Sequence, residues 1–186
     1  MAELQDPSTL PGERRRIHLR RISCEGFERP DGLIDIEGTL TDTKPEPIAM
    51  LEKNLAAGEP IHRMVLRIAI DRDRVIREAE ARTLDSPYGI CGNITASYGK
   101  LVGLRIEPGF TKTIKRMFRG VAGCTHITEL LPPMATTAFQ ILWDGPDAKS
   151  DADDESKRSS PLDGCHALRR DGEIVRLHFP HEARPG

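Results

Sequence analysis

Four side chains that bind metals or act as nucleophiles lie in the central stretch of the chain, between residues 62 and 129. They are His62, Cys91, Cys124 and His126, and each is expected at the end of a strand or at the start of a helix. Thiolates and imidazoles are ligands that suit zinc and iron in proteins. Their arrival from separate elements indicates a site for a single zinc or iron ion.

The two cysteines of this set are also candidates for reactive thiols. Cys91 and Cys124 are both expected near a helix N-terminus, where free N–H groups and the helix dipole favour the thiolate. Their separation is too long for a local metal motif, so the site depends on the fold bringing them together. The alternative is that each is a small residue buried between helix and sheet, as free cysteines often are.

Carboxylates near these ligands are candidate catalytic groups. His126 and Glu129 lie three residues apart on one helix face, so they can share a proton or a metal. Asp35 and Glu37 share one face of a predicted strand and are candidates for an acid–base pair or for oxygen ligands. The alternatives are a surface ion pair on the helix and solvent-facing acids on an edge strand.

Four further residues are candidates for substrate binding. Tyr88 and Tyr98 flank Cys91, and a tyrosine hydroxyl there could bind a substrate oxygen; core aromatics with a hydrated hydroxyl are the alternative. Arg29 and Lys44 lie beside turn prolines and could hold an anionic substrate; solvated loop charges are the alternative.

Composition limits the class of protein. With 186 residues, 38% of them apolar, the chain is long enough for one domain with a core and an appendage. A formal net charge of −2 predicts neither a nucleic-acid partner nor a membrane partner. Acidic residues near the arginine cluster at residues 14–21 offset its charge, so we expect solvated arginines there rather than a nucleic-acid site. We expect a small-molecule substrate, and the sequence leaves homo-oligomerisation open.

Localisation is predicted from the cysteines and from the N-terminal residues. No apolar run reaches the length of a membrane span, and the polar N-terminal residues do not resemble a signal peptide. The four cysteines are therefore expected as reduced thiols in the cytoplasm rather than as a disulfide framework.

The pattern along the chain predicts an α+β domain. Residues 1–14 are expected as a flexible leader, 15–143 as the domain, 144–161 as a polar linker, and 162–182 as a C-terminal hairpin with its turn at Asp171-Gly172. Strands are expected near 17–22 and over 33–44, 62–71 and 75–85, the last two forming a hairpin, whereas 48–57 has helical spacing.

Helices follow the strands. They are expected from the region after Pro87 to Val102, over 111–119, and from Cys124 or Thr125 onward, with a break or kink at Pro132-Pro133. Strands followed by helices predict an antiparallel sheet with the helices packed on one face.

Two resemblances extend these inferences. The segments DGLIDIEG, DTK, GEPIHRM, PYGIC and GCTHITELL resemble an uncharacterised bacterial domain family, over most of residues 15–143 and again near residues 165–166. Within residues 64–139, the order MVLRIAID, VIREAEART, CGNITAS, YGKLVG and CTHITELL is similar to the U-type iron–sulfur cluster scaffold.

The scaffold resemblance implies roles for particular residues. Cys91 and Cys124 take the places of two cluster-ligating cysteines, and His62 lies near the third. The sequence departs from the scaffold where GEPIHRM replaces the first cysteine-bearing loop, and where Gly123 replaces the histidine beside the last cysteine. The extra N-terminal and C-terminal hairpins have no counterpart in the scaffold.

Two functions follow from these residues as hypotheses. The first is a zinc- or iron-dependent enzyme acting on a small organic substrate, either a lyase with retro-aldol-type carbon–carbon cleavage or a hydrolase. The alternative is a non-catalytic carrier of a metal or an iron–sulfur cluster. A purely structural interaction domain is a third outcome. The sequence has no phosphate-binding glycine loop and no serine-hydrolase motif.

Overall fold

The computed structural model describes residues 15–143 and 162–184. The chain divides into two compact units with the boundary between Leu142 and Trp143. The expected leader (1–14) and linker (144–161) lie outside the described residues.

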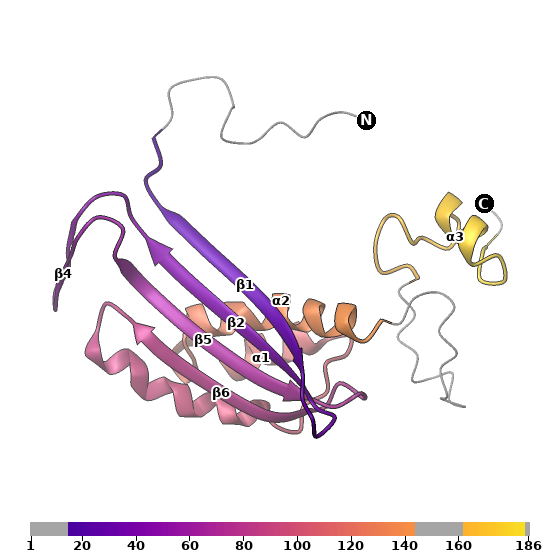
Figure 1. The fold of residues 1–186 in the computed structure, drawn as a ribbon, viewed down its shortest axis with the longest axis horizontal. Helices are drawn as coiled ribbons and strands as arrows, with labels where there is room; N and C mark the ends of the chain where they lie inside the picture. Colours follow the sequence, from indigo (N-terminus) through magenta and orange to yellow (C-terminus); the bar gives the residue numbers. More distant parts are fainter. Residues whose placement is uncertain (1–14, 144–161, 185–186) are drawn as a thin grey trace. The chain divides into compact units, whose positions relative to one another are not determined.

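The first unit contains a four-stranded antiparallel sheet in the order β1-β2-β5-β6 (Figure 1). Its strands are β1 (Leu19–Glu28), β2 (Ile34–Thr43), β5 (Pro60–Ile70) and β6 (Ile76–Asp85). Buried residues alternate with partly exposed ones along the whole of β2, as expected for a strand with one face on a core. The expected antiparallel sheet is confirmed, and β1 with β2 forms the N-terminal hairpin.

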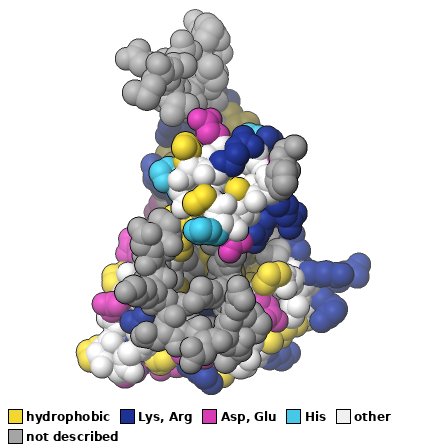
Figure 2. Space-filling model, turned by 90° about the vertical axis from the view of Figure 1, so that its right-hand side faces the viewer, with side chains coloured by type: hydrophobic (Ala, Val, Ile, Leu, Met, Phe, Trp, Pro, Cys, Tyr) yellow, Lys and Arg dark blue, Asp and Glu magenta, His cyan; other side chains and the backbone are white. Residues whose placement is uncertain are grey.

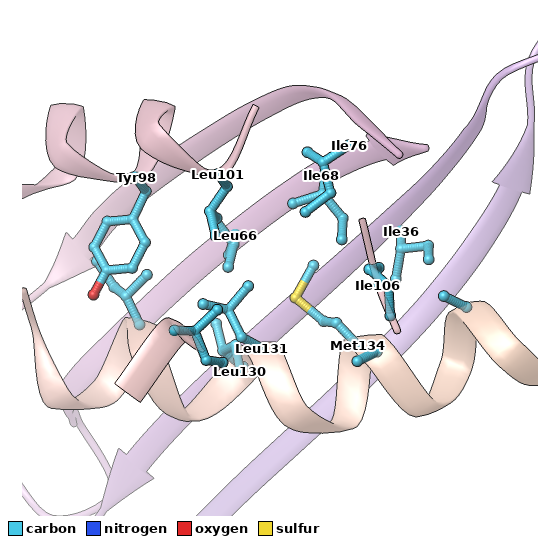
Figure 3. Close-up of a cluster of buried hydrophobic side chains, with 14 of the residues drawn as sticks. Ile36, Leu66, Ile68, Ile76, Tyr98, Leu101, Ile106, Leu130, Leu131 and Met134 are labelled. Carbon is cyan, nitrogen blue, oxygen red and sulfur yellow. The ribbon is translucent and has the colours of Figure 1, made fainter. Parts of the chain in front are cut away.

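Helices cover one face of this sheet (Figure 1). They are the 3₁₀ helices η2 (Gly89–Leu101) and η3 (Gly120–Ala122) and the α-helices α1 (Phe110–Met117) and α2 (Thr125–Ile141). Side chains from the sheet, such as Leu66 and Ile68, meet Leu130 and Met134 of α2 in a continuous core (Figure 3). The α+β class with helices on one face is therefore confirmed.

In the part of the chain that the structure describes, no helix has the length and apolar character needed to cross a bilayer.

Helix α2 continues through Pro132 and Pro133, where the sequence predicts a break or a kink. A proline in a helix interior costs about 3 kcal/mol, because it removes a hydrogen bond and crowds the preceding turn. On either side of the prolines Leu130, Leu131 and Met134 are fully buried, and each such burial stabilises by about 1.5–3 kcal/mol. Packing against the sheet therefore keeps the helix continuous.

Residues 48–57 are extended rather than helical, which corrects the expectation from their spacing. They form a two-stranded ribbon of β3 (Ile48–Ala49) and β4 (Asn54–Leu55), closed by a hydrogen bond from the Met50 N–H to the Lys53 carbonyl. Ten residues are too few for a helix to be stable without packing. Only Leu55 of this segment is buried, so tertiary contacts do not supply the missing stabilisation.

The closing unit contains a short helix, α3 (Glu173–His178), and turns instead of the expected hairpin. Gly172 has φ −87° and ψ 163°, whereas a two-residue hairpin turn at Asp171-Gly172 needs positive φ. Gly172 instead precedes the helix, whose Val175 is buried. Figure 2 shows apolar, basic and histidine side chains interspersed on the face that it presents.

Gly38 in the middle of β2 determines how closely α2 approaches the sheet. A Cβ atom at this position would lie 2.7 Å from the Met134 sulfur and 3.4 Å from the Leu130 Cβ. Because α2 begins beside the end of β2, this close packing also positions His126 of α2 next to Asp42 of β2.

Candidate metal centre

Three neighbouring strands place a row of polar side chains at one end of the sheet. Arg20 on β1 is the cross-strand partner of Asp42 on β2, and Asp42 is in turn the partner of His62 on β5. Asp42 lies on the same face of β2 as Ile36 and Leu40, because side chains two apart on a strand share a face. It is the one buried charged side chain among the described residues, with 1% of its surface exposed.

Helix α2 supplies the fourth member of the site. Cys124 is the N-cap residue of this helix, so His126 lies in its first turn. The imidazole of His126 stacks on that of His62, with ring centroids 3.7 Å apart and an interplanar angle of 25°. The two rings therefore face the Asp42 carboxylate together.

Asp42, His62 and His126 have the geometry of a metal-ligand set. One ligand atom from each residue lies within 4.8 Å of the others, and no other such group of three exists among residues 15–143 and 162–184. His62 Nδ1 is 3.2 Å, and His126 Nε2 is 3.7 Å, from Asp42 Oδ2. His62 Nδ1 is buried and has no hydrogen-bond partner in the described structure. Two imidazoles and one carboxylate are a donor set that suits iron or zinc.

Hydrogen bonds from the described residues occupy three acceptor sites of the Asp42 carboxylate, which leaves one lone pair for an ion. Arg20 Nε and His18 Nε2 donate to Oδ1 at 2.8 and 3.0 Å, and Arg20 Nη2 donates to Oδ2 at 2.8 Å. An ionised carboxylate has about four acceptor sites. The remaining site on Oδ2 is on the oxygen nearest to His62 and His126, where a cation would complete the coordination of this carboxylate.

Electrostatics keep the carboxylate ionised and the imidazoles neutral. Burial by itself raises the pKa of the Asp42 carboxyl, but hydrogen bonds from Arg20 and His18 outweigh it and lower that pKa to about 2. Burial lowers the pKa of His62, and the neighbouring His126 lowers it further. Burial and the charge of Arg20 lower the pKa of His126. These protonation states are the ones that metal binding requires.

Two predicted residues border the centre. Glu129 Oε2 accepts a hydrogen bond from Arg20 Nη1 at 2.5 Å, so the arginine links it to Asp42. Cys124 Sγ lies 3.9 Å from His126 Nδ1, on the side of the ring away from the Nε2 that faces Asp42. Glu129 and Cys124 are therefore neighbours of the ligand set rather than members of it.

The other predicted ligands and acids lie outside this set. Cys91 is near the start of η2, where its N–H bonds the Tyr88 carbonyl, and it is not among the converging ligand atoms. Asp35 and Glu37 lie on the opposite face of β2 from Asp42, because they are an odd number of residues away. Asp35 accepts hydrogen bonds there from Arg67 and Arg29.

The predicted substrate-binding residues are also dispersed. The Tyr98 hydroxyl is bonded to the Cys124 backbone and to Thr128, so it anchors the start of α2. Tyr88 is the exposed residue before η2. Arg29 bonds Asp31, Asp35 and Glu78. Lys44 is exposed.

Three residues of the centre were missed by sequence reasoning, namely His18, Arg20 and Asp42. A signal for Asp42 was present, because it continues the buried face of Ile34, Ile36 and Leu40 at two-residue spacing. A carboxylate on such a face requires partners. Arg20 and His18 carried no comparable signal, since their contact with Asp42 depends on the register of β1.

The fold and the candidate centre define a two-layer α+β domain in which Asp42, His62 and His126 converge. Residues 18–140 match the family described as "Protein of unknown function (DUF2889)". The chain belongs to this family, which confirms the resemblance to an uncharacterised domain family, and the match includes every residue of the centre. No curated protein and no solved structure matches the chain, and the similarity to the U-type scaffold stays a prediction.

Proposed function

We propose that this protein is a metal-dependent enzyme acting on a small organic substrate, with one zinc or iron ion bound by Asp42, His62 and His126. The observation that carries the proposal is the buried Nδ1 of His62, which has no hydrogen-bond partner among the described residues and lies 3.2 Å from Asp42 Oδ2. A buried polar atom without a partner is costly, and a bound cation removes that cost.

Three protein ligands leave coordination positions for a substrate, as in catalytic rather than structural metal sites. A bound zinc or iron ion would act as a Lewis acid toward a carbonyl or alkoxide oxygen. Glu129 lies one helical turn after His126 and is exposed, which supports a role for it in transferring a proton of the substrate. A lyase with retro-aldol-type cleavage and a hydrolase both use this combination.

The alternative of an iron–sulfur carrier has less support. Iron–sulfur clusters are bound mainly by cysteine thiolates, and the converging set in the described residues contains none. A carrier of this kind would contain acid-labile sulfide, whereas the proposed enzyme would contain a single ion without sulfide.

Metal and sulfide analysis of protein purified without oxygen tests the proposal. We expect one zinc or iron per chain, no sulfide, and loss of the metal in Asp42→Asn. Asp35→Asn is the matched control, since this carboxylate is on the same strand but the opposite face. Absence of metal in the wild-type protein after exposure to zinc and to ferrous iron would refute the proposal, as would full metal content in Asp42→Asn.

We also propose a cytoplasmic location and a small-molecule substrate as the principal partner, without nucleic acid or membrane. The four cysteines are free thiols, which suits a reducing compartment. Size-exclusion chromatography with light scattering would determine whether the protein is a homo-oligomer.

A further inference from the structure

The charges around the proposed ion do not cancel. Asp42 and Glu129 each carry one negative charge, and Arg20, which bonds both, carries one positive charge. Imidazoles bind a metal in their neutral form, so His62 and His126 add no charge to this group. With a divalent ion the group therefore has a net charge of +1, which a ligand with one negative charge would neutralise.

Arg20 has N–H donors that have no acceptor among residues 15–143 and 162–184. A guanidinium group has five N–H donors in a planar fork. Among the described residues, Nε and Nη2 of Arg20 bond Asp42, and Nη1 bonds Glu129. Two N–H groups, one on each terminal nitrogen, have no acceptor there. The Arg20 side chain is 37% exposed, so these donors are accessible from solvent beside the ligand set.

A cleft next to the centre offers space for the rest of such a ligand. It has a volume of about 380 Å³ and lies between α1 and α2. Ile114, Phe118 and Pro132 form its apolar wall, and the rest of its lining is polar: Lys115, Thr125, Thr128 and Glu129. Since Glu129 also bonds Arg20, the cleft and the arginine meet at this carboxylate.

We infer that the substrate is an organic carboxylate with an apolar body, whose carboxylate is bound by Arg20 while the body occupies the α1–α2 cleft. Arg20 is thus a specificity-determining residue for the proposed reaction, because guanidinium binds carboxylates in a geometry that a lysine cannot reproduce. This inference rests on the proposed function, since the uncompensated positive charge comes from the ion.

Binding of benzoate to the zinc-loaded protein, measured by isothermal titration calorimetry, tests the inference. Benzyl alcohol is the neutral comparison compound with the same ring. We expect benzoate to bind at least tenfold more tightly than benzyl alcohol. We also expect Arg20→Lys, which keeps the charge beside Asp42, to retain zinc but to bind benzoate at least tenfold more weakly. Arg21→Gln, at the next position of the same strand on its opposite face, is the matched control and should leave both affinities unchanged.

The outcomes separate this inference from the proposed function. Failure of the wild-type protein to bind zinc or iron would refute the metal centre and this inference with it. If zinc binds but benzoate and benzyl alcohol bind equally, the metal centre stands and the carboxylate specificity is overturned. This comparison needs only the wild-type protein, so it decides the question even if the Arg20 variant does not fold. Unchanged benzoate affinity in zinc-loaded Arg20→Lys would overturn the role of Arg20.

Discussion

Asp42 and His62 are direct cross-strand partners in β2 and β5, with Oδ2 and Nδ1 3.2 Å apart and without a hydrogen bond between them. The register of two strands is therefore what brings the carboxylate and the imidazole together. A slip of one residue would turn every side chain of the strand to the other face. The centre thus depends on the same pairing that buries the core.

Replacement of His126 should weaken metal binding without disrupting the sheet. We expect His126→Gln to lower zinc affinity by at least tenfold, because two ligands remain where three converged. His166→Gln, in the closing unit, is the control and should bind zinc as the wild type does. Competition with a chromophoric zinc chelator measures both affinities, and equal values for the two variants would contradict the role of His126.

Zinc should stabilise the folded protein. A ligand that binds only the native state at a concentration 100 times its Kd adds about 2.7 kcal/mol to the free energy of unfolding. We expect a rise in Tm on addition of zinc to the wild-type protein and little or no rise with Asp42→Asn. Differential scanning calorimetry gives both values; an equal rise in the variant would place the zinc elsewhere.

The stability of the metal-free protein should fall on acidification from pH 7 to pH 5. The pKa values of His62 and His126 are lowered in the folded state by burial, so below about pH 6.5 the unfolded chain binds more protons than the native protein. Asp42 does not contribute in this range, because its stabilisation is lost only as the pH falls from its ordinary pKa of 3.8 through its folded-state pKa of about 2. His126→Gln should reduce the slope of Tm against pH in this range, and an unchanged slope would contradict this assignment.

A larger side chain at Gly38 should displace α2. We expect Gly38→Val to lower the free energy of unfolding by about 1–3 kcal/mol, as overpacking does, because its side chain would collide with Met134. Thr39→Val, on the opposite face of β2, should change stability much less. Urea denaturation compares the two. Zinc affinity should also fall in Gly38→Val, since α2 carries His126.

The hydroxyl of Tyr98 should contribute to stability rather than to catalysis. It accepts a hydrogen bond from the Cys124 N–H and bonds the Thr128 hydroxyl, and Tyr98→Phe would remove both of these bonds. We expect a loss of about 1–3 kcal/mol in the free energy of unfolding, whereas Tyr88→Phe, at an exposed position, should have almost no effect. Chemical denaturation distinguishes the two, and similar small losses would contradict the anchoring role.

Much of the architecture was predictable because its signals are local. Alternation of apolar and polar residues predicted β2 and the β5–β6 hairpin, and strands followed by helices predicted the α+β class. The same local reasoning failed at residues 48–57 and at Asp171-Gly172. Helical spacing favours a helix at residues 48–57, and the Asp-Gly dipeptide favours a hairpin turn. Few buried contacts stabilise either conformation.

The residue types of the chain by themselves determined that His62 and His126 were candidate ligands, because a neutral imidazole can bind a metal wherever it lies in a fold. The tertiary structure alone decided that Asp42, rather than Asp35 or Cys91, converges with them. Strand register pairs Asp42 with His62, and packing of α2 on the sheet brings His126 across a separation of 64 residues from His62. These contacts join segments that are far apart in the sequence, and the local periodicity of one segment does not predict which distant side chain will contact it.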